Sequence, residues 1–203
     1  MWAYVKDGVL KQTNVNQTKL EINPGSYFPV KYANEWTIEQ KNAYGVYEIE
    51  EDRTNWKDPS FYTNGKETSA YDSTNDKVTL TWASATAKSL ADVNFTQADQ
   101  DAGLGTKDEL NYRGLTYLHK QTISKTAHDL LAPTDWYASR KAEAGTAIPS
   151  NVGTYRAAVR TKAAAMHDLI DNADTVDKLA ALYVYNTDNP PTRPLGEFPD
   201  PVE

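Results

Sequence analysis

Residues 130–173 read LLAPTDWYASRKAEAGTAIPSNVGTYRAAVRTKAAAMHDLIDNA. This pattern predicts a short helix, a connector and a long amphipathic helix. Pro133 breaks the preceding helix because its ring removes a backbone donor. Gly145 is expected to end the short helix, since glycine adopts a left-handed cap without strain. Pro149 then opens the long helix, where a missing N–H is tolerated.

The apolar residues of the long helix recur at alternating gaps of three and four, which places them on one helical face. Such a face is buried only against another element, so a helical bundle is expected. We expect Trp136 to pack beside this face, and Trp136→Ala to cost about 3–5 kcal/mol by leaving a cavity. The alternative is that Trp136 anchors an interface. The face consists of Val152, Tyr155, Val159, Ala163, Met166, Ile170 and Ala173.

Two short motifs lie in this stretch, LLAPTDW at residues 130–136 and TYRAAVR at residues 154–160. They resemble the LLAxTDW and TYRxxLR motifs of tailed-bacteriophage tail assembly chaperones and tail-fibre assembly proteins. Pro133 and Val159 depart from that pattern. The order of the predicted elements, with a β-rich N-terminal half followed by a helical C-terminal half, is also similar to that of small tail proteins of marine phages. The matching residues are Leu130, Leu131, Ala132, Thr134, Asp135, Trp136, Thr154, Tyr155, Arg156 and Arg160.

The resemblance implies a non-enzymatic bacteriophage tail protein that binds a tail-fibre or tail subunit and assists its assembly or attachment. A structural virion component, such as a fibre-attachment or baseplate-peripheral protein, is the alternative, and a carbohydrate-binding tip is a third. The implied partners are other phage tail or tail-fibre proteins, or further copies of the chain as a homo-oligomer. The implied location is the host cytoplasm during assembly, or the virion tail.

The composition narrows the function classes. The chain has 203 residues, a formal net charge of −7 and no cysteine. Its length suits one or two domains with a proper core. The negative charge argues against non-specific nucleic-acid binding, and the lack of cysteine removes disulfides and thiolate chemistry. The start lacks the features of a signal peptide. No apolar run approaches the ~20 residues that cross a bilayer, so no membrane partner is expected.

The order of these patterns predicts an α+β protein. We expect a small antiparallel β domain at residues 1–84, an α-helical bundle domain at residues 85–185 and an extended, proline-rich tail at residues 186–203. The tail has few apolar residues and is expected to be disordered when alone in solution. In the β domain, Asp7-Gly8 is the favoured turn of a hairpin.

Local signals place several smaller elements. Thr37 is expected to cap a short helix. The second half is predicted to begin with a short helix at about residues 86–92, followed by a linker or loop at residues 94–106. A long helix is then expected over residues 107–131, and Asp174 is expected to cap the last helix.

No residue pattern predicts catalysis or a metal site. His119 and His128 are nine residues apart on one predicted helix, so they face opposite sides and cannot share a metal. Asp99, Asp101 and Asp108 lack the spacing of a calcium loop, and no serine has the surroundings of a nucleophile. We therefore expect no enzyme, cofactor or metal; two facing carboxylates of the glycosidase kind are the alternative.

Two groups of residues are candidates for partner binding. Arg156 and Arg160 share a helical face at i, i+4, where they either bind a partner's carboxylates or pair within the chain with Glu143 or Asp135. Aromatic residues crowd the loops of the front domain, where they either stay half exposed for a partner or cover a thin sheet. These aromatic residues are Tyr27, Phe28, Tyr32, Trp36, Trp56, Phe61 and Tyr62.

Overall fold

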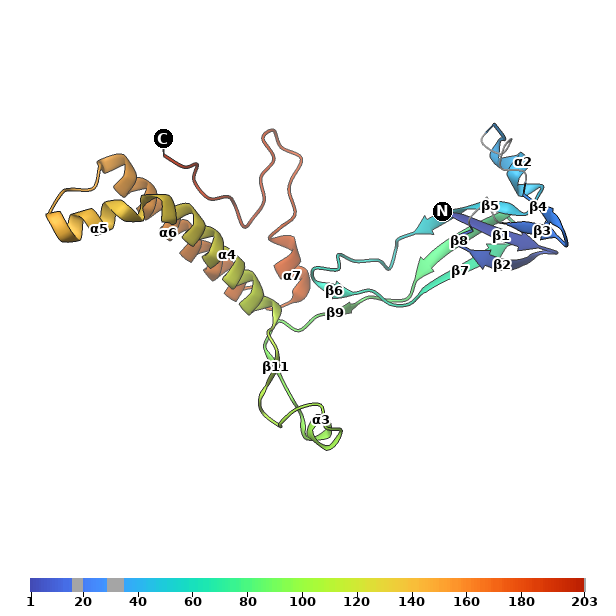
Figure 1. Cartoon of the computed structure of the whole chain (residues 1–203), viewed down its shortest axis with the longest axis horizontal. Coiled ribbons are helices and arrows are strands. Elements are labelled where there is room, and N and C mark those ends of the chain that lie inside the picture. Colours follow the sequence, from blue (N-terminus) through green and yellow to red (C-terminus); the bar gives the residue numbers. More distant parts are fainter. Residues whose placement is uncertain (16–19, 29–34, 203) are drawn as a thin grey trace. The chain divides into compact units, whose positions relative to one another are not determined.

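The computed structural model describes residues 1–15, 20–28 and 35–202. The chain divides into two compact units, Met1–Thr86 and Ala87–Glu203. The first unit is built on a β-sheet and the second on helices, which confirms the α+β class (Figure 1). Within the described residues, no helix combines the length and the apolar character needed to cross a membrane.

The first unit contains a five-stranded sheet in the order β2-β1-β5-β8-β7. Three of its neighbouring pairs are antiparallel, as expected. The central pair, β5 with β8, is parallel, with Ile49 opposite Val78. The sheet is therefore mixed, because the chain leaves β5 and returns to it through the connection that carries β7. The bounds are β1 Trp2–Lys6, β2 Val9–Thr13, β5 Val46–Asp52, β7 Glu67–Asp72 and β8 Lys77–Trp82.

Local turn and cap signals in this unit are confirmed. Asp7 and Gly8 join β1 to β2 with φ angles of 54° and 71°, the left-handed backbone that this two-residue turn requires. Thr37 caps α2 (Ile38–Asn42): its side chain accepts from the Gln40 N–H, and the Gln40 side chain accepts from the Thr37 N–H. The short ladders pair β3 (Glu21–Asn23) with β4 (Ser26–Tyr27), and β6 (Tyr62–Thr63) with β9 (Thr86–Ala87).

Both faces of the sheet carry a hydrophobic core. Successive residues of a strand point to opposite faces, so Ala3 and Val5 belong to one cluster and Tyr4 to the other. The two clusters explain why β1 carries apolar residues at four successive positions, Trp2 to Val5. One cluster contains Ala3, Val5, Tyr47, Ile49, Val78 and Leu80, and the other contains Tyr4, Val15, Leu20, Phe28 and Val46.

The second unit begins with a β-hairpin rather than the helix expected at residues 86–92. Strands β10 (Val93–Asn94) and β11 (Leu110–Tyr112) pair and carry α3 (Gln97–Asp101) between them. The segment expected as a linker is thus structured, and the long helix predicted from residue 107 starts only at Leu115. The helix starts late because Asp92 holds the residues just before it. The Asp92 carboxylate accepts a hydrogen bond from the Gly114 N–H at 2.8 Å and forms an ion pair with Arg113.

Two long helices form the body of this unit. Helices α4 (Leu115–Leu131) and α6 (Ser150–Asp171) lie side by side and run in opposite directions (Figure 1). A 3-10 turn (Ala132–Thr134) and α5 (Asp135–Ala144) connect them. The predicted apolar face of α6 is confirmed, with Val152, Tyr155, Val159, Met166 and Ile170 all buried.

The ends of the shorter helices follow the local sequence with one exception. Gly145 ends α5 with a φ of 69°, as predicted. Helix α7 (Val176–Ala181) is capped by Thr175, whose hydroxyl accepts from the Lys178 N–H, and not by Asp174. Asp174 instead forms an ion pair with the Lys178 ammonium at 2.8 Å.

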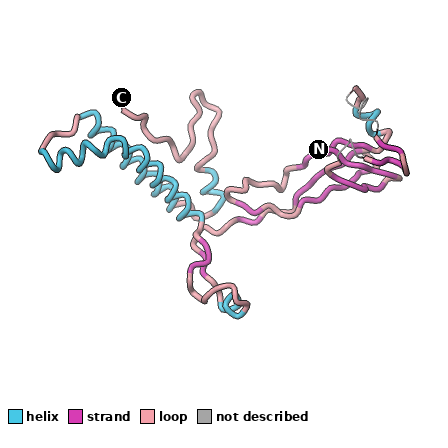
Figure 2. Tube along the Cα trace, viewed as in Figure 1, coloured by secondary structure: helices cyan, strands magenta, loops and turns pink. Residues whose placement is uncertain are grey.

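The proline-rich C-terminal segment is ordered on the helices, so the expectation of disorder is wrong. It has no helix or strand (Figure 2), yet Leu195 is fully buried. Phe198 and Val202 pack against the core cluster of α4 and α6. A few apolar side chains hold this polar stretch, because each buries its surface against the helical unit.

Candidate functional site

The two sequence motifs are bonded to each other through Arg156. Its Nη1 donates to the carbonyl oxygen of Leu131 at 3.0 Å and to the Thr134 hydroxyl at 2.6 Å. Its Nη2 donates to Asp135 Oδ1 at 2.8 Å. A buried guanidinium is tolerated only when its donors are satisfied. We call Arg156, Leu131, Thr134 and Asp135 the α5–α6 clamp.

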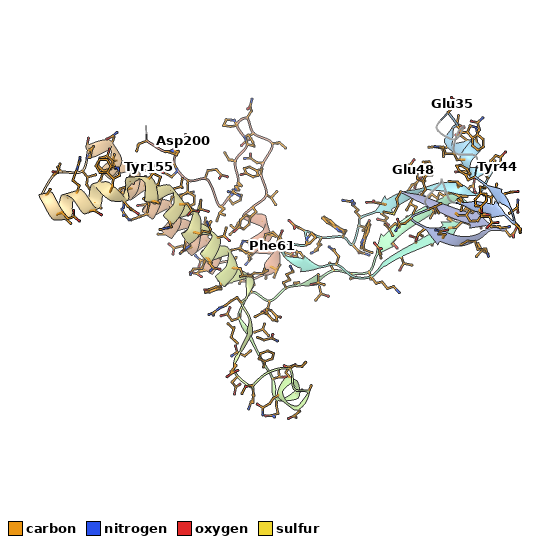
Figure 3. All side chains as sticks on the ribbon, in the orientation of Figure 1. Glu35, Tyr44, Glu48, Phe61, Tyr155 and Asp200 are labelled. Carbon is orange, nitrogen blue, oxygen red and sulfur yellow. The ribbon has the colours of Figure 1, made fainter. Side chains whose placement is uncertain are left out.

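The neighbouring tyrosine strengthens the same junction. Tyr155 (labelled in Figure 3) is buried in the cluster between α4 and α6. Its hydroxyl donates to the carbonyl oxygen of Leu130 at 3.3 Å. This places Tyr155 in the core, as expected, and ties α6 to the end of α4.

Arg156 and Arg160, both considered for partner binding, differ in their surroundings. The prediction that Arg156 binds a partner is wrong, because this residue is buried and its guanidinium is bound within the clamp. The alternative, a pair with Asp135, is observed. Arg160 is exposed, and its Nη1 donates to the backbone carbonyl of Arg156 at 3.4 Å. Arg160 therefore stays available on the surface of α6.

The expectation that Trp136 belongs to the core is wrong. Its side chain is 51% exposed and stacks on Tyr137, with 3.8 Å between the ring centroids. The guanidinium of Arg140 lies 4.7 Å from the Trp136 ring and 5.3 Å from the Tyr137 ring. Asp135 faces Arg156, and the next residue lies about 100° further around the helix, so Trp136 points away. We call Trp136, Tyr137 and Arg140 the α5 platform.

Sequence reasoning missed Tyr137 and Arg140, although a signal for Arg140 was present. Positions 136 and 140 are i, i+4 on a helix, so an aromatic and an arginine there meet on one face. Tryptophan, tyrosine and arginine are the residues that contribute most to protein–protein binding. The α5 platform therefore has the residue composition that is typical of a protein–protein interface.

Three of the front-unit aromatic residues predicted to bind a partner are buried, so that prediction is wrong for them. Phe28, Phe61 and Tyr62 are 3%, 5% and 6% exposed. Phe28 packs its edge against Trp36 and Tyr44, at 5.8 Å and 6.4 Å between ring centroids. Phe28 belongs to a core cluster of the sheet, so this ring covers the sheet, which was the alternative. Phe61 and Tyr62 lie at the start of β6 and belong to neither of the two sheet clusters.

The other front-unit aromatic residues differ in exposure. Tyr27 is 61% exposed. Trp56 is 36% exposed, with the Arg53 guanidinium 5.4 Å from its ring centroid. Trp36 is half-buried. Tyr32 lies outside the described residues. In this unit, Tyr27 and Trp56 therefore remain as exposed candidates; Tyr27 ends β4, and Trp56 lies in the loop after β5.

A pocket of about 760 Å³ lies in the second unit beside α4 and α6. His167 Nε2 lies there at 3.1 Å from the carbonyl oxygen of Lys120 and 3.3 Å from the Ser124 hydroxyl. A carbonyl only accepts, so Nε2 carries the proton and donates to it. This imidazole nitrogen is therefore not placed to take a proton from Ser124, and the pair lacks the geometry of a nucleophile with its base.

Two further polar residues considered as possible ligands, His119 and Asp99, form hydrogen bonds within the fold. The His119 Nδ1 lies 2.6 Å from the Tyr183 hydroxyl, and burial lowers the pKa of His119. Asp99 caps α3 together with Thr96. Among the described ranges, no three histidine, aspartate or glutamate side chains converge as metal ligands would.

One carboxylate in the first unit was not predicted from the sequence. Asp76 Oδ1 accepts hydrogen bonds from the hydroxyls of Tyr47 and Tyr71, each at 2.7 Å. The Tyr47 hydroxyl, and then that of Tyr71, lower the pKa of Asp76. Burial raises the pKa of Tyr47, and so does its bond to Asp76. This arrangement holds the β7–β8 turn against β5.

Comparisons of the chain with protein-family models, with curated proteins and with solved structures give no match in any of the three. The function is therefore interpreted from the two motifs and from the geometry that joins them.

Proposed function

We propose that the chain is a non-enzymatic bacteriophage tail protein that binds a tail-fibre or tail subunit and assists its assembly or attachment. Its binding surface is the α5 platform. We assign it no catalytic residue, cofactor or metal, and no nucleic-acid or membrane partner. It acts in the host cytoplasm during assembly.

One observation carries the proposal. The clamp gives Thr134, Asp135 and Arg156 a structural role, because these three side chains join α5 to α6. Trp136 belongs to the same motif but is half exposed and takes no part in the clamp. A motif that resembles those of tail assembly proteins thus combines a rigid support with one large aromatic side chain directed to solvent.

The chemistry of the platform suits a protein partner. Rings with an apolar body and a polar edge bury a large area at little entropic cost. Arg140 is already held over both rings, so less freedom is lost when its donors meet a partner's carboxylate. A partner segment with an apolar side chain beside a carboxylate fits this surface.

Affinity capture from infected cells tests the proposal. Tagged wild-type chain is expected to co-purify with a tail or tail-fibre protein, and Trp136→Ala is expected to lose it. Tyr117→Ala is the matched control, because Tyr117 is also part-exposed, with the Arg113 guanidinium 4.3 Å from its ring centroid, but lies on α4 outside the residues considered for partner binding. Equal capture by Trp136→Ala, or no tail protein with wild type, would reject the proposal.

Mass spectrometry of purified virions then separates the two roles that the resemblance implies. An assembly protein is expected to be absent from the particle. A structural component, such as a fibre-attachment or baseplate-peripheral protein, is expected at a fixed copy number.

A further inference from the structure

Aromatic rings, and not a carboxylate, hold Arg140 on α5. Its guanidinium lies 4.7 Å from the centroid of the Trp136 ring and 5.3 Å from that of Tyr137. In the part of the chain that the structure describes, no hydrogen bond or ion pair joins it to an acidic side chain. Glu143 lies within reach at i+3 on the same helix, yet the arginine extends the other way, toward the rings. Its positive charge is therefore left for an external group.

The guanidinium of Arg140 offers one particular edge to a ligand. Its Nε is enclosed and has no acceptor, whereas its two Nη atoms are not enclosed. Arginine binds a carboxylate through two parallel N–H groups, with N···O distances of about 2.7–2.9 Å. A side-on approach through Nε is closed here, so a carboxylate fits end-on, with one oxygen on each Nη. A planar, two-oxygen anion is the group that matches this edge.

The chain around the platform is basic, although the whole protein is acidic. Residues 132–166, all of which the structure describes, contain five basic and two acidic residues, in a chain with a formal net charge of −7. One of the two acids, Asp135, is already paired with Arg156. The local charge therefore favours an anionic partner surface. The five basic residues are Arg140, Lys141, Arg156, Arg160 and Lys162.

We propose that the α5 platform selects an acidic segment of its protein partner, and that Arg140 is the residue that sets this specificity. The two Nη atoms bind one side-chain carboxylate of the segment end-on, while Trp136 covers an apolar side chain beside it. This inference rests on the proposed function. The site rejects the amide of the same shape, because an amide lacks the charge and places its own N–H groups against those of Arg140.

A nucleic-acid backbone is the other source of anionic groups, and the platform fits it less well. Such a partner is bound by a row of basic side chains that neutralise several phosphates. Here a single guanidinium fork lies on two rings, and the carboxylate of Glu143 follows one turn later on the same helix. The arrangement suits one carboxylate next to apolar surface.

Two model peptides test the selection with the full chain. Fluorescence anisotropy compares a fluorescein-labelled peptide of repeated Gly-Leu-Glu units with a twin that carries glutamine in place of glutamate. Wild type is expected to bind the glutamate peptide about tenfold more tightly. Arg140→Gln should abolish this preference, and Arg140→Lys should keep only a small part of it, because lysine keeps the charge but loses the planar fork. Lys141→Gln, which removes the same charge one position away, should change it by less than about twofold.

Circular dichroism at 222 nm checks that each variant is folded. The proposal is overturned if wild type shows no preference between the peptides, or if Lys141→Gln loses as much of it as Arg140→Gln. It is also overturned if mixed-sequence duplex DNA binds wild type more tightly than the glutamate peptide and depends on Arg140. Capture of a tail protein that requires Trp136, without any peptide preference, would reject only the carboxylate selection. A peptide preference that requires Arg140, without capture of a tail protein, would reject the proposed function instead.

Discussion

The Arg156 guanidinium donates to Asp135 Oδ1 at 2.8 Å, and this ion pair joins the second turn of the long α6 helix to the first residue of α5. The arginine is buried, whereas the carboxylate is half exposed. The pair therefore sets the rotation of α5 about its axis. That rotation turns the next residue, Trp136, toward solvent.

Replacing the buried arginine should weaken the second unit. Arg156→Ala leaves the Thr134 hydroxyl without its donor and Asp135 without its ion pair, and it opens a cavity, so we expect a loss of about 2–4 kcal/mol in the free energy of unfolding. Urea unfolding followed at 222 nm measures it, because most helical residues lie in this unit. Arg160→Ala, an exposed neighbour, is the control and should change stability by less than about 0.5 kcal/mol.

Removing the exposed tryptophan should affect binding and not stability. Trp136→Ala is expected to cost less than about 1 kcal/mol, since the ring is half exposed and fills no core site. Tyr155→Ala, which empties a buried site one helix away, is expected to cost about 3–5 kcal/mol. Equal losses in urea unfolding for the two variants would show that Trp136 does contribute to the core.

The sequence predicted those elements whose signals lie within a few residues. Asp7-Gly8 requires left-handed backbone, which specifies the β1–β2 turn. Thr37 begins α2 because its side chain and that of Gln40 satisfy each other's backbone. The apolar spacing of α6 needs no distant partner to be recognised. Each of these predictions depends on local geometry alone.

The wrong predictions of strand pairing and of the start of α4 depend on contacts between distant residues. The parallel pairing of β5 with β8 is absent from any local pattern. Leu110 fits a helical spacing as well as a strand, and what stops the helix is Asp92, which binds Gly114 from 22 residues away. In the candidate site, the sequence left open whether Arg156 binds a partner or pairs within the chain with Glu143 or Asp135. Only the observed geometry of the Arg156–Asp135 pair fixes the direction of Trp136.

Removing the shared carboxylate should destabilise the first unit. Asp76→Ala leaves the hydroxyls of Tyr47 and Tyr71 without their acceptor, and we expect a loss of about 1–2 kcal/mol. Tyr71→Phe removes one of the two hydrogen bonds and should cost about half as much. Tryptophan fluorescence follows this unit, because it contains four of the five tryptophans, Trp2, Trp36, Trp56 and Trp82.

The same carboxylate should make the first unit sensitive to acid. The two tyrosine hydroxyls lower the pKa of Asp76 below its usual value. The unfolded chain therefore takes up this proton at a higher pH than the folded chain does. The contribution is fully present above the ordinary aspartate pKa of about 3.9 and is lost as the pH falls through the folded value. In Asp76→Asn, the free energy of unfolding measured by tryptophan fluorescence should vary less with pH in this range than in wild type. An unchanged dependence on pH would show that Asp76 is not the source of the acid sensitivity.

Stability of the second unit should fall between about pH 7.5 and pH 5.5 because of His119. Burial lowers the pKa of this imidazole, so below its ordinary pKa of about 6.5 the unfolded chain binds more protons than the folded chain. The free energy of unfolding then decreases as the pH falls, until the folded imidazole is itself protonated. The lowered pKa values of the aspartates act at more acidic pH and do not overlap this range.

Substitution of the histidine tests this dependence. His119→Gln keeps a polar side chain beside the Tyr183 hydroxyl but removes the titrating group, so its urea-unfolding free energy at 222 nm should vary less between pH 7.5 and pH 5.5 than that of wild type. His128→Gln, on the exposed side of α4, is the matched control and should retain the wild-type slope. If His119→Gln keeps the full slope, the acid sensitivity comes from another group, and the contact of α4 with Tyr183 does not depend on a neutral imidazole.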